Sequence, residues 1–182
     1  WDQTGGMADG FVGAIGTGGT LAGVAMALRD RSPDIAIALA DVPGAAMHSY
    51  YTTGELKAEG SSITEGIGQG RVTANLEGFK PDHSFFIPDP ESLEVTYRLL
   101  KEEGLALGLS SGVNVAGAIR LPRELGPGKT IVTMLCDQVI EKETVLVEDN
   151  RIKEAGARVN IPANAKRIDV VLHKDGSLSV AD

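Results

Sequence analysis

The residues best placed to do chemistry are five consecutive glycines and threonines, Gly16-Thr17-Gly18-Gly19-Thr20. They follow a short apolar segment at 11–15 and precede a longer apolar segment at 21–28. A glycine-rich turn between a strand and a helix lets several backbone N–H groups converge on one point, and the helix N-terminus adds its partial positive charge. The threonine hydroxyls are further donors, and the loop contains no lysine or arginine. This pattern predicts an anion site, suited to a phosphate group held in one orientation.

The local pattern leaves four interpretations of this loop open. A nucleotide-binding P-loop requires a Lys-Ser/Thr pair at its end, where this loop has Thr20-Leu21. A dinucleotide-binding fingerprint fits Gly16 and Gly18 and has an acid, Asp41, about 20 residues further on, but it requires a third glycine where Leu21 stands. The other two interpretations are a site for a cofactor phosphate, such as that of pyridoxal phosphate, and a turn without a ligand.

Two further glycine-containing segments could approach the same ligand. Gly108-Leu109-Ser110-Ser111-Gly112-Val113-Asn114 precedes a segment of small and apolar residues, and taken alone it predicts a helix-capping turn. Glu65-Gly66-Ile67-Gly68-Gln69-Gly70-Arg71 alternates glycine with other residues. Such spacing predicts either a close approach of the backbone to a ligand or a simple bend.

The elements expected to position these loops alternate between strands and helices. We predict strands at 11–15, 35–40, 84–87, 105–108 and 130–135, and helices at 19–30, 45–58, 89–103 and 112–124. This order predicts an α/β fold, with a parallel sheet and helices on both faces. Asp89 should cap its helix, and Met26 and Met47 should fill the core. The glycine loops would then lie at the carboxyl ends of strands, where ligands bind in such sheets.

Length and charge limit the classes of function. The chain has 182 residues, room for one good-sized domain and a small appendage, and a formal net charge of −8. The negative charge argues against nucleic-acid binding, and the glycines and threonines within 11–28 make that uncharged stretch a poor membrane span. The one cysteine, Cys136, excludes an intramolecular disulfide and is expected to be a buried, inert thiol.

Taken together and in this order, the segments resemble the cysteine synthase (O-acetylserine sulfhydrylase) family, which are tryptophan-synthase-β-like, fold type II pyridoxal phosphate enzymes. The resemblance runs over residues 1–137 and is carried by WDQTGGMADGF, GTGGTLAGV, SYYTTGELKAEGSSITEGIGQGRVTANLEGF, EEGLALGLSSGVNVAGAIRL and GKTIVTMLCD. It implies the large C-terminal domain of such an enzyme. The dinucleotide interpretation falls with it, and Asp41 becomes an ordinary acid at a strand end.

The resemblance also implies a role for each matched residue. Gly16, Thr17, Gly18, Gly19 and Thr20 would hold the phosphate of pyridoxal 5′-phosphate, Ser110 would face its pyridine nitrogen, and Gly66, Ile67 and Gly68 would lie beside substrate and cofactor. The complete enzyme would eliminate acetate from O-acetylserine and add sulfide to give cysteine. It would be a cytoplasmic homodimer, although the differing ends of this chain weaken the expectation of a dimer.

Other functions stay open beside this one. Relatives that act on serine, homocysteine or threonine share the fold, so a cystathionine β-synthase or a serine/threonine dehydratase is an alternative. A non-catalytic module that binds phosphate or a nucleotide is a second alternative, and a fragment without function is a third.

The sequence departs from the family at both ends. The Asn-Pro-Thr-Gly-x-x-Lys segment, whose lysine forms a Schiff base with the cofactor, does not occur. We therefore assign no catalytic residue, expect the chain to be the C-terminal part of a longer enzyme, and expect it to be inactive alone. Residues 138–182 differ from the family and predict small β-hairpins, one with an Asp175-Gly176 turn. The runs VLVEDNRIKEAG and IPANAKRID are weakly similar to the N-terminal β-segment of amidohydrolases, without a His-x-His metal motif, and suggest a fusion or a frame accident.

Overall fold

A computed structural model describes residues 1–136 with their side chains, and the strands at 144–148, 151–156, 170–172 and 178–180. The chain divides into two units, Trp1–Gln138 and Val139–Asp182. The first begins with a 3₁₀ turn, η1 (Asp2–Thr4). Within the described residues, no helix has both the length and the apolar character needed to cross a membrane.

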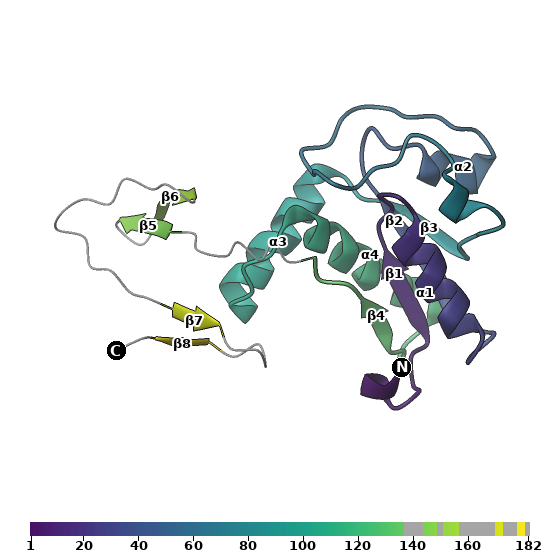
Figure 1. Cartoon of the computed structure of the whole chain (residues 1–182), viewed down its shortest axis with the longest axis horizontal. Coiled ribbons are helices and arrows are strands. Elements are labelled where there is room, and N and C mark those ends of the chain that lie inside the picture. Colours follow the sequence, from purple (N-terminus) through teal and green to yellow (C-terminus); the bar gives the residue numbers. More distant parts are fainter. Residues whose placement is uncertain (137–143, 149–150, 157–169, 173–177, 181–182) are drawn as a thin grey trace. The chain divides into compact units, whose positions relative to one another are not determined.

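A four-stranded parallel sheet forms the centre of the first unit (Figure 1). Its strands lie in the order β3 (His83–Phe86), β2 (Ala36–Asp41), β1 (Gly10–Gly13) and β4 (Ile131–Thr133). Phe11 of β1 is paired with Ile37 of β2 and with Val132 of β4. All of β1 and β2 is buried, which fits their continuous apolar sequences.

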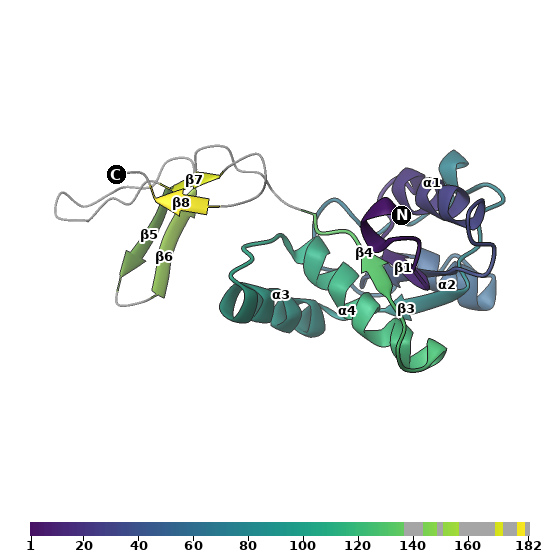
Figure 2. The same cartoon turned by 90° about the horizontal axis from the view of Figure 1, so that it is seen from below.

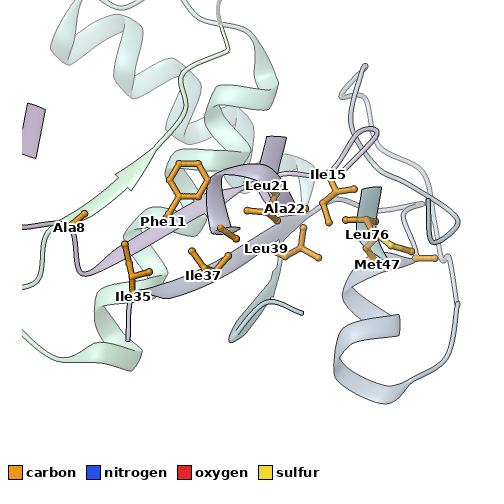
Figure 3. Close-up of a cluster of buried hydrophobic side chains, with 12 residues drawn as sticks. Ala8, Phe11, Ile15, Leu21, Ala22, Ile35, Ile37, Leu39, Met47 and Leu76 are labelled. Carbon is orange, nitrogen blue, oxygen red and sulfur yellow. The ribbon is translucent and has the colours of Figure 1, made fainter. Parts of the chain in front are cut away.

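Helices cover both faces of this sheet, as predicted. They are α1 (Gly19–Arg29), α2 (Met47–Thr53), α3 (Asp89–Glu103) and α4 (Leu109–Leu125), and Figure 2 shows α1 and α4 on opposite sides of β1. Strand side chains alternate between the two faces. One core cluster joins Phe11, Ile37 and Leu39 to Leu21 and Ala25 of α1 (Figure 3). The other joins Val12, Ala38 and Ala40 to Val113, Ala116 and Leu121 of α4.

Small residues let α4 lie directly on the sheet. A Cβ atom on Gly117 would lie 2.8 Å from Cγ1 of Val12 and 2.9 Å from Cβ of Ala40. At such distances any larger residue at Gly117 would push the helix outward. The close contact fixes the start of α4 beside the end of β1, where the predicted loops meet.

Several predicted elements differ from the structure. Residues 105–108 form no strand, because only a short segment without a buried residue separates Gly104 from α4, and no buried face stabilises an extended pairing. The helix predicted at 45–58 spans only Met47–Thr53, since Gly54 takes a left-handed conformation with φ of 83°. Helix α4 begins at Leu109, three residues before the predicted start, so Ser110 lies in its first turn.

Three side-chain predictions have mixed outcomes. Asp89 does not cap α3, because its carboxylate instead accepts hydrogen bonds from Ser62 Oγ (2.6 Å) and the Ile63 N–H (3.0 Å). Met47 is fully buried, as expected. Met26 is 71% exposed, so its placement in the core was wrong, because it lies on the outer face of α1.

The described part of the second unit consists of two antiparallel pairs, as the sequence predicted. Strand β5 (Thr144–Glu148) pairs with β6 (Arg151–Gly156), and β7 (Val170–Leu172) pairs with β8 (Leu178–Val180). The predicted Asp175-Gly176 turn lies outside the described residues.

Asp41 is not the ordinary strand-end acid that we expected. Its side chain is 1% exposed, and Oδ2 accepts a hydrogen bond from the N–H of His48 at 2.7 Å. Oδ1 has no hydrogen-bond partner among the described residues. Burial is the main cause that raises the pKa of Asp41 from its usual 3.8 to about 6, against the lowering effect of the backbone N–H donors.

The buried carboxyl group predicts a specific pH dependence of stability. Because the folded pKa lies above the usual value, the favourable contribution of Asp41 is complete below pH 3.8 and is lost as the pH rises to about 6. We expect Asp41→Asn to remove this loss, which amounts to about 3 kcal/mol at about 1.4 kcal/mol per pKa unit. Urea unfolding of the parent and of Asp41→Asn from pH 4 to 7.5 measures this loss of unfolding free energy. The control is Asp34→Asn, at an exposed position. Parallel curves for the Asp41 variant and the parent would contradict the prediction.

Candidate functional site

A cavity of about 290 Å³ opens where β1 ends and α1 begins. Residues from the three predicted glycine loops line it, together with residues at the ends of β1 and β4. The lining residues are Phe11, Gly13, Ala14, Gly16, Thr17, Gly18, Thr20, Leu21, Gly66, Ile67, Asn114, Met134 and Cys136. Among the predicted site residues, Gly16, Thr17, Gly18, Thr20, Gly66 and Ile67 reach the cavity wall, whereas Gly19, Gly68 and Ser110 are not part of that lining.

The start of α1 leaves several backbone donors without helical acceptors. Gly18 is the N-cap residue and takes a left-handed φ of 86°, which favours glycine. The first intrahelical bond runs from the Ala22 N–H to the Gly18 carbonyl at 3.0 Å. The N–H groups of residues 18–21 therefore have no acceptor within the helix. They also lie at its positive end, so this end of the cavity suits an anion.

The carbonyl groups that precede these donors are bound by the segment 66–76. The Gly68 N–H donates to the Ile15 carbonyl at 2.9 Å, and Gln69 Nε2 donates to the Gly16 carbonyl at 3.1 Å. The Thr17 carbonyl accepts two hydrogen bonds, which come from Thr73 Oγ1 at 2.7 Å and Asn75 Nδ2 at 3.1 Å. In a trans peptide the C=O and the next N–H point in opposite directions. The N–H groups of residues 16–18 therefore point away from these donors.

The segment 66–76 also touches the loop sterically. A Cβ atom on Gly16 would lie 2.7 Å from the Gly66 carbonyl oxygen. One on Gly18 would lie 2.6 Å from Leu76, a buried residue of the 3₁₀ turn η2 (Ala74–Leu76). Two of the loop glycines are thus needed for contact with another part of the chain.

The first turns of α4 connect the ends of two strands. Ser111 is fully buried, and its hydroxyl donates to the Cys136 carbonyl at 2.9 Å and accepts from the Cys136 N–H at 2.7 Å. Asn114 is also buried, and Oδ1 accepts from the Ala14 N–H at 2.8 Å while Nδ2 donates to the Met134 carbonyl at 2.9 Å. Asn114 therefore joins the segment after β1 to the segment after β4. Ser110 is half-buried in the same turn.

Sequence reasoning gave no role to Asn114, Gln69, Thr73 or Asn75. Each lies inside or beside a recognised motif, but its partner is distant in the sequence. Their amide and hydroxyl groups were the available signal, because polar side chains next to glycine loops often bind the backbone.

Cys136 lies at the cavity, and the prediction that it is buried is wrong. Strand β4 ends at Thr133, so Cys136 has left the sheet and is half-exposed. Its sulfur accepts a long hydrogen bond from Asn114 Nδ2 at 3.7 Å.

Among residues 1–136, which the structure describes, no basic side chain lines the cavity. Lys57 instead forms an ion pair with Glu59 at 2.5 Å, and Lys129 forms one with Asp9 at 2.9 Å. An anion in this cavity would be held by backbone N–H groups and hydroxyls alone.

Comparison with known proteins shows what this arrangement is similar to. Residues 1–137 match the model of a family described as pyridoxal-phosphate dependent enzyme. The chain is 49% identical over 142 residues to cysteine synthase 1 of Neurospora crassa, covering 75% of this chain and 38% of the relative. It is 43% identical over 176 residues to cysteine synthase 1 of Emericella nidulans, covering 94% and 48% respectively. The chain thus spans less than half the length of these two curated relatives.

A solved structure shares the fold. The O-acetylserine dependent cystathionine beta-synthase from Helicobacter pylori superposes with a TM-score of 0.67 at 29% sequence identity, over 75% of this chain and 42% of that one. Together with the parallel sheet, this likeness confirms the predicted fold class.

The contact between Gly16 and Gly66 predicts the effect of one added methyl group. We expect Gly16→Ala to lower the free energy of unfolding by about 1–3 kcal/mol, because the new Cβ meets a backbone carbonyl that cannot rotate away. The matched variant is Gly23→Ala, in an open position of α1 where the added Cβ would meet no described atom within 4 Å beyond its chain neighbours and the nearby helix backbone. It should raise stability by about 0.5–1 kcal/mol. Urea unfolding measures both, and equal effects would refute the prediction.

Proposed function

The chain belongs to the pyridoxal-phosphate dependent enzymes, and we propose that residues 1–137 are the cofactor-binding part of a cysteine synthase. The complete enzyme would act on O-acetylserine and sulfide. One observation carries the proposal: the segment 66–76 binds the carbonyl groups of residues 15–17, so the N–H groups of residues 16–18 face away from that segment at a cavity.

The donor set of the cavity fits the phosphate of pyridoxal 5′-phosphate. Four N–H groups at the positive end of α1 and the hydroxyls of Thr17 and Thr20 could surround its oxygens. No cation is required, because a phosphate ester can be held by several aligned backbone dipoles. Gly16, Thr17, Gly18, Gly19 and Thr20 are therefore our proposed phosphate-binding residues.

When bound, pyridoxal phosphate supplies an electron-withdrawing ring that activates the bonds at the amino-acid Cα. We propose that Ser110 offers its hydroxyl to the pyridine nitrogen. A neutral hydroxyl does not require the nitrogen to carry a proton, which limits the ring as an electron sink and favours β-elimination over transamination. The first turn of α4 holds Ser110 in place, because the neighbouring Ser111 is bonded to both backbone groups of Cys136.

We propose that Gly66, Ile67 and Gly68 lie beside the amino-acid substrate. Gly66 and Ile67 line the cavity, and Gly68 fixes this stretch to β1 through its hydrogen bond to the Ile15 carbonyl. Backbone without large side chains lets the substrate lie against the wall of the site. For the complete enzyme we expect a cytoplasmic homodimer, on the strength of the family resemblance.

The Helicobacter pylori likeness favours a second candidate function. That protein is named as an O-acetylserine dependent cystathionine beta-synthase. The same cofactor-binding part could therefore serve an enzyme that shares O-acetylserine but accepts homocysteine as the sulfur donor. The cavity described here would bind the cofactor in either case, so the sulfur donor must be determined by assay.

We assign proton transfer at the cofactor to a lysine that lies outside residues 1–136, since no lysine of that region lines the cavity. The chain alone, supplied with pyridoxal phosphate, O-acetylserine and sulfide, is accordingly expected to form no cysteine above the protein-free rate. A ninhydrin assay for cysteine measures this. Turnover by the purified chain would show that one of its own lysines serves the reaction.

A chimera tests the proposed function directly. Residues 1–137 would replace the matching part of the Neurospora crassa cysteine synthase 1, and we expect the chimera to form cysteine from O-acetylserine and sulfide. The same chimera carrying Gly16→Ala should lose most of this activity, because the phosphate loop is displaced.

The two outcomes of the chimera experiment have different meanings. A folded chimera that binds pyridoxal phosphate but releases no acetate from O-acetylserine would refute the proposal. A chimera that uses homocysteine in place of sulfide would favour the second candidate.

A further inference from the structure

We propose that Thr73 and Asn75 are positioning residues for the phosphate of the cofactor, acting together through the carbonyl group of Thr17. This inference rests on the proposed function of the loop. It concerns side chains that touch neither the cavity wall nor, on this view, the phosphate itself.

The two side chains meet the same oxygen from one short turn. Thr73 precedes η2 and Asn75 lies within it, and they donate to the Thr17 carbonyl at 2.7 Å and 3.1 Å. Leu76 of the same turn is buried against the position of Gly18 and belongs to the core cluster around α1. Figure 3 shows Leu76 beside Met47 at the edge of that cluster. The turn is therefore anchored by an apolar side chain while its polar side chains hold the loop.

Two donors on one carbonyl fix the plane of the peptide between Thr17 and Gly18. Rotation of that plane would break both hydrogen bonds, and because the peptide is planar it would also turn the Gly18 N–H. Hydrogen bonds to a carbonyl also polarise the peptide and strengthen its N–H as a donor.

A purely structural role would give a different result from a positioning role. A tether that only stabilises the fold would change the free energy of unfolding and would weaken pyridoxal and pyridoxal 5′-phosphate alike. A device that orients the N–H groups toward phosphate would change the affinity for the phosphorylated form alone. The ratio of the two dissociation constants therefore distinguishes the two roles.

The experiment measures binding of pyridoxal 5′-phosphate and of pyridoxal to the full chain by isothermal titration calorimetry. We expect the double variant Thr73→Val/Asn75→Ala to reduce the preference for the phosphorylated form about tenfold, the effect of roughly 1.4 kcal/mol. The Thr73→Val single variant should lose part of this preference. Thr73→Ser keeps the hydroxyl and should therefore retain most of the preference that Thr73→Val loses. Circular dichroism checks that each variant is folded.

The matched control removes an equivalent bond elsewhere. Thr52 Oγ1 donates to the His48 carbonyl at 2.7 Å within α2, so Thr52→Val makes the same chemical change away from the loop. It should leave the preference unchanged. If the double variant does not fold, the two single variants provide the test, because each leaves one donor on the Thr17 carbonyl.

The outcomes test the phosphate site and the positioning role of Thr73 and Asn75 separately. If the parent chain does not prefer pyridoxal 5′-phosphate over pyridoxal, the proposed phosphate site is wrong and the inference falls with it. If the parent shows the preference and the folded variants keep it in full, the phosphate site stands and the positioning role of Thr73 and Asn75 is refuted.

Discussion

The structure around the cavity depends on how three successive carbonyl groups, those of residues 15–17, are bound. Donors from the segment 66–76 satisfy all of them, so the opposite edges of the same peptides are left facing away from that segment. A glycine-rich turn could adopt many conformations without such bonds. The contact between Gly16 and Gly66 and the anchoring of Leu76 beside Gly18 hold the segment close enough to make them. The orientation of the N–H groups of the loop is thus a property of two segments together.

The sheet brings the remaining parts of the site to the same place. Ala38 and Ala40 on β2 and Gly117 on α4 allow the helix to lie close to the strands, so the first turns of α4 reach the ends of β1 and β4. There Asn114 bonds to both segments, and Ser111 bonds to Cys136. Packing of small residues and hydrogen bonding by buried polar side chains therefore serve one purpose. Each fixes the relative positions of segments that are distant in the sequence, and the Ala14–Asn114 bond joins residues 100 positions apart.

Local patterns predicted what depends on local physics. The parallel α/β sheet, helix α3 and the glycine loop at Gly16–Thr20 followed from periodicity and from glycine placement. What depends on distant contacts could not be predicted in this way. Thr73 and Asn75 bond to a residue 56 and 58 positions earlier, and nothing in their own surroundings indicates that partner. Asp41 looked ordinary because only the folded chain buries it. Residues 105–108 looked like a strand because their apolar side chains do not reveal that none of them becomes buried.

No basic side chain from residues 1–136 lines the cavity, so the donors on this side of the site should respond little to pH and to salt. Backbone N–H groups and threonine hydroxyls do not titrate between acid and mildly alkaline pH, so their number and strength as donors are constant over that range. Fixed dipoles also act at short range and are less affected by dissolved salt than a pair of exposed charges. On this side of the site, an anion would therefore be held by neutral backbone N–H groups and threonine hydroxyls. Any dependence of the complete protein on acidity or ionic strength would have to originate in other groups.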